Sequence, residues 1–241
     1  MVKVSLELIA RDAINAVKKK DIIVVIDVLR FSSSVLTSFA NGAKEVIPTK
    51  TLKEAYEIRK KYPSYILAGE RRGLRPPGFD LGNSPLEFKE SKVKGKTLVF
   101  TTTSGTQALT RTSSADWVFI GGFLNLKSIS LKISEYARKY VAGISLLLSG
   151  RKGHFSLEDF LCAGAIICNL TLEEVELSDA AIASFLAYKQ SKNKICETIM
   201  LGEHAKHLID LGYENDVKFS CQTNLYNLVP AYRNNVIKLF D

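Results

Sequence analysis

The richest concentration of groups able to do chemistry lies in segment 68–85, AGERRGLRPPGFDLGNSP. Guanidinium groups bind phosphate or carboxylate through paired hydrogen bonds, and carboxylates bind divalent cations. Prolines lower the cost of ordering a loop, whereas glycines let its backbone approach a ligand. A solvated charged loop would need neither, so this segment predicts an anion site. Its candidate ligands are Glu70, Arg71, Arg72, Asp80 and Asn83.

A second candidate follows the apolar run 22–26, IIVVI. Asp27 comes directly after this run and Arg30 lies three residues on. An aspartate at a strand tip suits a magnesium ligand or a phosphate-accepting nucleophile, and Arg30 could clamp a phosphate. The competing interpretation is a structural ion pair between Asp27 and Arg30, with Ser32 capping a helix. Leu29 stands where phosphatases of the haloacid-dehalogenase type need a second acid, so that family is not indicated.

A third candidate is rich in hydroxyl groups and follows the apolar residues of TLVFTTTSGTQAL. Hydroxyls, a glycine and a helix start together make a cradle for an anion. The sequence lacks the Gly-Lys-Ser/Thr of a Walker A loop. An ordinary helix-capping turn is the alternative. Ser104 could instead be a nucleophile, but no base for it can be assigned from sequence. The cradle residues are Thr102, Thr103, Ser104, Gly105 and Thr106.

Two further acids, Glu158 and Asp159, lie in HFSLEDFLCAGAI. Their oxygens could bind Mg²⁺. The simpler interpretation is helix capping, because Ser156 and Asp159 stand three apart and acids in a first turn favour the helix dipole.

The elements that must position these residues alternate between strand and helix. Strand-like segments occur at 1–10, 22–26, 65–67, 97–101, 117–120 and 144–148. Helical patterns occur at 34–43, 51–62, 128–140, 156–170, 178–188 and 203–211. Such alternation predicts an α/β fold: a three-layer α/β/α arrangement with a mixed, largely parallel sheet and a more helical C-terminal part. Ligands of open α/β sheets bind beyond the carboxyl ends of the strands, where the candidates above fall.

Composition narrows the class of protein. The 241 residues carry a net charge of +8, and no Pro-, Gly- or Ser-rich linker divides them. We therefore expect a single domain over 1–241, with a helical sub-lobe at about 151–215. No apolar run is long enough to cross a membrane. The four cysteines lack paired spacing, which favours free thiols in a cytoplasmic protein. The basic balance could steer anions toward the protein, although solubility is the favoured explanation of the net charge taken alone.

Taken together, these stretches resemble the magnesium-dependent 2-phosphosulfolactate phosphatases of coenzyme M biosynthesis. The likeness runs through DVLRFSSS, NGAKEVIP, AGERRGLRPPGFDLGNSP, GKTLVFTTTSGT, GGFLN and LEDFLCAGA. It continues more weakly into LGYENDVKFSCQTNLYNLVP, and the segment from GERRG to NSP is the most specific part. Phe31 and Ser104 depart from the residues usual in that family, and both are expected in the pocket.

The resemblance implies hydrolysis of a phosphomonoester on a sulfonated three-carbon acid, yielding 3-sulfolactate and phosphate. It also implies Mg²⁺, and our hypothesis is that some of Asp27, Glu70, Asp80, Glu158 and Asp159 hold it. On this hypothesis Arg30, Arg71 and Arg72 clamp the anionic ends, and Asn125 completes the cradle with 102–106. Asp27 is the preferred nucleophile or water-orienting base, with water or Ser104 as alternative nucleophiles.

Two other function classes remain in view. A non-catalytic binder or sensor of a small phosphorylated or sulfonated acid is the main alternative. A nucleic-acid-binding protein is not expected, because no recognised motif occurs and the arginines lie among carboxylates that would repel a phosphate backbone. The expected partner is a small polyanionic phosphorylated acid, and the sequence leaves open whether the chain forms a homo-oligomer.

Overall fold

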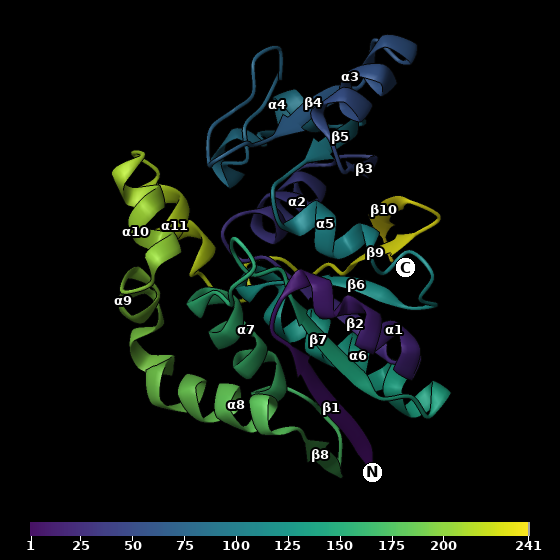
Figure 1. Cartoon of the computed structure of the whole chain (residues 1–241), viewed down its shortest axis with the longest axis vertical. Helices are drawn as coiled ribbons and strands as arrows, with labels where there is room; N and C mark the ends of the chain where they lie inside the picture. Colours follow the sequence, from purple (N-terminus) through teal and green to yellow (C-terminus); the bar gives the residue numbers. More distant parts are fainter. Residues whose placement is uncertain (241) are drawn as a thin grey trace.

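A computed structural model describes residues 1–240 of the chain (Figure 1). Their ten strands form one sheet, in the order β4-β5-β3-β10-β9-β6-β2-β7-β1-β8. The α/β class with a mixed, largely parallel sheet is therefore confirmed. No helix in this described part is long and apolar enough to span a membrane.

The sheet consists of two parallel blocks. The smaller block is formed by β4 (Ile66–Gly69), β5 (Thr97–Thr101) and β3 (Glu45–Thr49). The larger block is formed by β6 (Val118–Gly121), β2 (Ile22–Ile26), β7 (Ile144–Leu148), β1 (Val2–Glu7) and β8 (Val175–Leu177). Each block is thus an ordinary parallel α/β unit.

A hairpin of two short strands, β9 (Pro230–Arg233) and β10 (Val236–Leu239), joins the blocks. Strand β10 pairs antiparallel with β3, and β9 pairs antiparallel with β6. Three antiparallel pairings therefore lie between the blocks, so the blocks run in opposite directions. Figure 1 shows the smaller block above and the larger block below, with the carboxyl ends of their strands directed toward the middle of the molecule.

Helices cover both faces of the larger block, because its strands are apolar on both sides. Along β2, Ile22, Val24 and Ile26 enter one hydrophobic cluster, and Ile23 and Val25 enter another. The first cluster includes side chains from α6 (Leu126–Tyr140) and α7 (Leu157–Cys168). The second includes side chains from α1 (Ala13–Lys19), α2 (Phe31–Ala40), α4 (Glu90–Val93) and α5 (Gly105–Thr110). Helix α3 (Leu52–Lys61) packs on the smaller block through a third cluster.

The more helical C-terminal part is also present. It continues from α7 through α8 (Asp179–Ser191), α9 (Ile195–Met200), α10 (Glu203–Asp210) and α11 (Glu214–Ser220). Figure 1 shows these helices as a green-to-yellow arc along one side of the molecule. Four strands were not predicted from the sequence: β3, β8, β9 and β10.

Candidate active site

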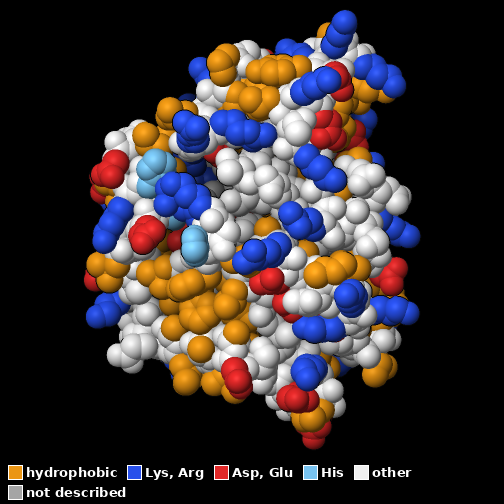
Figure 2. Space-filling view, in the orientation of Figure 1, with side chains coloured by type: hydrophobic (Ala, Val, Ile, Leu, Met, Phe, Trp, Pro, Cys, Tyr) orange, Lys and Arg blue, Asp and Glu red, His pale blue; other side chains and the backbone are white. Residues whose placement is uncertain are grey.

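A cavity of about 260 Å³ lies where the two blocks face each other. Four loops line it, each following the carboxyl end of a strand. From the larger block come the loops after β2 and β7, and from the smaller block come the loops after β4 and β5. Helix α10 supplies the remaining side. Figure 2 shows this face as a hollow with blue basic side chains and pale-blue histidines close together at its edge.

Asp27 lies at the centre of this cavity and is only 7% exposed. Its Oδ1 accepts a hydrogen bond from the backbone N–H of Phe31 at 3.2 Å. Burial raises the pKa of Asp27 to about 6, with His204 opposing the shift and Glu70 adding to it. A carboxylate that titrates near neutrality is suited to proton transfer, because it exchanges protons readily at the pH of the cell.

A glycine allows the close packing around Asp27. A Cβ placed on Gly105 would lie 2.6 Å from Asp27 Oδ2 and 2.6 Å from a ring atom of Phe31. Phe31 itself is fully buried in the hydrophobic core, where its ring meets that of Phe100 edge-on. The expectation that Phe31 lines the pocket is therefore wrong, whereas Ser104 does line it.

Arg30 lines the cavity but is already paired. Its Nη1 lies 2.7 Å from Asp216 Oδ2, its Nη2 donates to the Gly73 carbonyl at 2.7 Å, and its guanidinium lies 4.2 Å from the Tyr213 ring centroid. Both charged partners are almost fully buried. The sequence-based alternative of an ion pair with Asp27 is not what forms. Arg30 instead fixes the loop after β4 against α11, so its position is set before any ligand binds.

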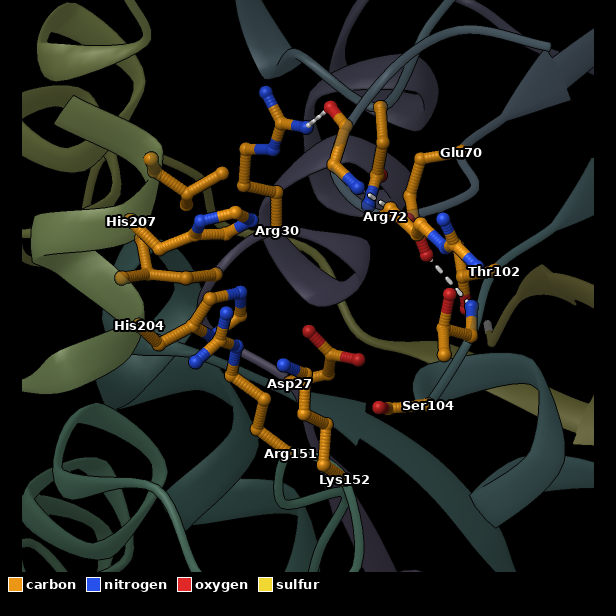
Figure 3. A pocket seen from close by; sticks show the side chains of 15 residues that line it. Asp27, Arg30, Glu70, Arg72, Thr102, Ser104, Arg151, Lys152, His204 and His207 are labelled. Atoms are coloured by element: carbon orange, nitrogen blue, oxygen red, sulfur yellow. Dashed lines mark hydrogen bonds between the residues drawn. The ribbon is translucent and has the colours of Figure 1, made fainter. Parts of the chain in front are cut away.

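Glu70 ties two cavity loops together. Its Oε1 accepts from the N–H of Thr103 at 2.6 Å and its Oε2 accepts from the N–H of Gly73 at 2.8 Å. Figure 3 shows both contacts as dashed lines. Both carboxylate oxygens are thus engaged by the protein, which gives Glu70 a positioning role where a metal contact was predicted.

Asp159 plays the same part in the other block. Its Oδ1 accepts from Val28 N–H at 2.8 Å, and its Oδ2 accepts from Gly150 N–H at 3.3 Å and from the Ser156 hydroxyl at 2.7 Å. Ser156 makes no side-chain cap on α7, so the predicted capping box does not form. Burial, with Glu158 nearby, raises the pKa of Asp159 well above its usual value.

Glu158 is turned toward α10. Its Oε1 lies 2.7 Å from His204 Nδ1, while its Oε2 is buried and has no hydrogen-bond partner. Glu158 does not line the central cavity but lines an adjoining one, which it shares with His204. This carboxylate therefore holds the imidazole that faces Asp27.

Asp80 and Arg71 lie outside the cavity lining. Asp80 forms an ion pair with Arg59 at 2.5 Å and accepts from Leu67 N–H at 2.8 Å. Arg71 donates to the backbone carbonyl of Glu70 at 2.8 Å. Both side chains shape the loop after β4, which corrects the prediction of Asp80 as a metal ligand and Arg71 as an anion clamp.

The hydroxyl cradle is only partly open to the cavity. Thr102, Thr103 and Ser104 line it, whereas Gly105 and Thr106 do not. Thr106 is fully buried and bonds to the backbone of Thr102.

Asn125 is also fully buried, and it bonds to the Gly122 N–H and to the carbonyls of Ile120 and Leu228. Asn125 thus fixes the loop after β6, and the predicted ligand contact is replaced by a structural one.

Basic groups that the sequence did not single out complete the site. Arg151 and Lys152 follow β7, and His204 and His207 project from α10 (Figure 3). With Arg72, they surround Asp27 on several sides. Burial and the nearby Arg151 lower the pKa of His207, which favours its neutral form.

Few oxygen atoms around the cavity remain available to a cation once these contacts are made. Within residues 1–240, no three His, Cys, Asp or Glu side chains form a ready set of metal ligands. Free oxygen donors nevertheless face the cavity. Asn83 Oδ1 is buried and has no hydrogen-bond partner. Asp27 uses Oδ1 to accept from Phe31, and its Oδ2 takes no part in that bond. Carboxylate and amide oxygens suit Mg²⁺, which binds through one or two protein ligands plus water and substrate phosphate, so these residues fit such an ion.

Comparison with known proteins identifies the family of this chain. The family model of 2-phosphosulpholactate phosphatase matches residues 8–235. A Thermotoga maritima protein named probable 2-phosphosulfolactate phosphatase is 44% identical over 216 residues, covering 90% of this chain and 91% of its own. Proteins of the same name from Caldanaerobacter subterraneus and Clostridium acetobutylicum are 39% and 38% identical. They cover 93% and 98% of this chain, and 94% and 99% of their own. The chain belongs to the 2-phosphosulfolactate phosphatase family.

Proposed function

We propose that this chain hydrolyses 2-phosphosulfolactate to 3-sulfolactate and phosphate, with Mg²⁺ as its cofactor. One structural observation carries the proposal. Asp27, a buried carboxylate with a pKa raised to about 6, lies in a cavity whose other walls present basic groups from both blocks. The names of the relatives supply the substrate. We further place the reaction in the cytoplasm, as the cysteine pattern favours, and in coenzyme M biosynthesis, as the resemblance implies.

The charge of the cavity suits this substrate. A phosphate ester next to a carboxylate and a sulfonate carries about four negative charges, because the second phosphate pKa is near 6. Arg72, Arg151 and Lys152 can neutralise these groups. Phosphoryl transfer depends mainly on positioning and on stabilising charge, so a preorganised basic cavity supplies much of what the reaction needs.

Asp27 is the residue we assign to the reacting phosphorus. As a base it takes a proton from the attacking water, whose oxygen bonds to phosphorus while the bond from phosphorus to the substrate oxygen breaks and that oxygen takes up a proton. If Asp27 attacks directly, the same bond breaks, an aspartyl phosphate forms, and a water then cleaves it to release phosphate. His204 faces Asp27, with its Nδ1 held 2.7 Å from Glu158. That contact leaves Nε2 as the ring nitrogen able to meet the substrate.

A bound Mg²⁺ would neutralise phosphoryl oxygens, and Asp27 and Asn83 are the residues that would hold it. Asp27 and Asn83 also have roles that do not depend on Mg²⁺. Asn83 places an amide acceptor in a mostly basic wall, and its backbone carbonyl accepts from Ser34 at 2.8 Å, which ties it to α2.

The decisive experiment measures phosphate release from a panel of phospho-acids that includes 2-phosphosulfolactate, in Mg²⁺ and in EDTA. We expect release with Mg²⁺, loss in EDTA, and loss of about a hundredfold or more in Asp27→Asn, by analogy with the removal of a general base. Binding of the phospho-acid without any phosphate release would favour the sensor interpretation. Unaltered turnover by Asp27→Asn would remove Asp27 from the mechanism.

A further inference from the structure

Two turns of the same shape face each other across the cavity. Arg71-Arg72-Gly73-Leu74 follows β4, and Arg151-Lys152-Gly153-His154 follows β7. In the first, Arg71 and Leu74 exchange backbone hydrogen bonds of 2.9 and 3.1 Å, and in the second, Arg151 and His154 exchange bonds of 2.8 and 3.0 Å. The two central residues of each turn have positive φ: 56° and 86° in the first, 51° and 80° in the second. These are tight two-residue turns of the I′ type.

A basic residue occupies a costly position in both turns. Side chains other than Gly, Asn and Asp are uncommon at positive φ, yet Arg72 and Lys152 hold this conformation at matching positions. Asparagine or glycine would adopt this positive φ with less strain, so the backbone conformation does not explain why basic residues occupy these positions. Strain of this kind clusters at ligand sites, where the surrounding structure maintains it.

A buried carboxylate holds each turn in the same manner. Glu70 accepts from Gly73 in its own turn and from Thr103 in the loop after the adjacent strand β5. Asp159 accepts from Gly150, next to the second turn, and from Val28 in the loop after the adjacent strand β2. Each turn is therefore locked to its own block, and the two turns are fixed relative to Asp27.

The tips of the turns point into one cavity from opposite sides. Figure 3 shows Arg72 above Asp27 and Lys152 below it. Both side chains are exposed and line the cavity. Neither has an ion-pair partner within the described chain. Two unpaired cations on opposite walls suit a ligand with separate anionic groups, because each group can then meet one cation.

We propose that the matched turns form a two-sided clamp, in which Arg72 and Lys152 bind the anionic groups of the substrate other than its phosphate. This inference rests on the proposed function and deepens it. In this arrangement the phosphoryl group lies at Asp27, and the side chains of Arg72 and Lys152 bind the carboxylate and the sulfonate. The site therefore selects phosphate esters of small acids with two further negative charges over esters that carry the phosphate alone.

The test compares two substrates across a set of charge-removing variants. One substrate is 2-phosphosulfolactate, and the other is glycerol 2-phosphate, a secondary phosphomonoester without further anionic groups. The variants are Arg72→Gln, Lys152→Gln and the pair combined. Lys20→Gln is the matched control, because Lys20 is an exposed lysine at φ 57° on the C-terminal end of α1, outside the cavity. Lys152→Arg tests rescue by charge.

We expect each single variant to lower kcat/KM for 2-phosphosulfolactate about tenfold or more and to leave glycerol 2-phosphate within about twofold. Lys20→Gln should change neither, and Lys152→Arg should restore most of the loss. Equal losses on both substrates would mean that the tips bind the phosphate itself, which overturns the clamp.

A binding measurement separates this inference from the proposed function. Calorimetry with 3-sulfolactate, which has no phosphate, should give a Kd for the wild type that rises about tenfold in each single variant. A protein that hydrolyses neither ester would end the proposed function, yet weakened 3-sulfolactate binding in both variants would still support the clamp. No binding by the wild type, or equal binding by all variants, would overturn it.

Discussion

Thr102 occupies in one block the position that Asp27 occupies in the other. Each is the first residue after its strand, β5 or β2, and its side-chain oxygen accepts from the backbone N–H four residues later, at 3.0 Å and 3.2 Å. The N–H of each then donates to a hydroxyl in the next turn, Thr106 or Ser32. The two blocks thus have the same local structure at these positions, but only Asp27 of the two residues is titratable. Under the proposed function, acid-base chemistry at these two matching positions therefore falls to Asp27, and Thr102 has no proton to exchange at neutral pH.

The raised pKa of Asp27 predicts how stability depends on pH. The folded protein keeps this proton up to about pH 6, whereas the unfolded carboxyl loses it near 3.8. Between these values the folded state binds more protons, so stability falls as pH rises, by about 3 kcal/mol in total. Asp27→Asn removes this cost. In EDTA, its free energy of unfolding should exceed that of the wild type above pH 6 and match it below pH 4. Equal stability at pH 7.5 would contradict the prediction.

The buried pair between Arg30 and Asp216 should be costly to break. Asp216→Asn leaves the Arg30 guanidinium buried without a countercharge, which costs about 3 kcal/mol or more in urea unfolding. The amide also keeps only one acceptor oxygen, which cannot serve both Arg30 and the Ser84 hydroxyl as the carboxylate does. Glu90→Gln is the control, because it breaks the exposed pair with Lys94 and should leave the melting temperature unchanged. Similar melting temperatures for the two variants would show that the buried pair is dispensable.

Gly105→Ala should reduce both activity and stability, because the new Cβ would lie 2.6 Å from Asp27 Oδ2 and equally close to the buried Phe31 ring. The carboxylate must therefore move before the methyl fits. A displacement of this size is expected to lower kcat/KM about a hundredfold. In Gly122→Ala the new Cβ would come no closer than 3.3 Å, to a flexible leucine end, and activity should change little. A fully active Gly105→Ala enzyme would show that the position of Asp27 tolerates change.

The hairpin that joins the blocks should govern both stability and activity. Ile237 is fully buried and pairs with Val46 of β3 and with Tyr232 of β9. Ile237→Ala should cost about 2–5 kcal/mol in unfolding and lower activity as well, because the two halves of the site lose their common support. Leu239→Ala, in the same strand but 44% exposed, is the matched control and should cost far less. The reverse order of effects would contradict this role for the hairpin.

The sequence predicted the larger block well, because its strands are continuous apolar runs. The run 22–26 becomes β2 with the same bounds, and 144–148 becomes β7. Strand β3 escaped prediction because Pro48 interrupts EVIPT, and proline is unusual inside a sheet. The C-terminal hairpin was also missed. Its signal was the pair Asn234-Asn235, both at positive φ, which is typical of a two-residue hairpin turn.

The site was only partly predictable, for a physical reason. Strand-tip position correctly brought Asp27, Glu70 and Thr102 to one cavity, but sequence does not show which oxygens the protein itself will use. Asp80 and Asn125 have suitable chemistry and are engaged in structural contacts. The basic wall at Arg151 depends on two blocks that run in opposite directions, which local patterns do not encode. The likeness of R-R-G-L to R-K-G-H was the available signal.

The antiparallel seam also sets the order in which the enzyme can mature. Strands β9 and β10 follow every other described strand in the chain, so they are synthesised last. Until the hairpin pairs with β3 and β6, the two blocks are joined by contacts such as Arg30 to Gly73 but not by a continuous sheet. A nascent chain would therefore contain both halves of its active centre before the sheet that aligns them is complete. We expect turnover only after the β9–β10 hairpin has paired with both blocks.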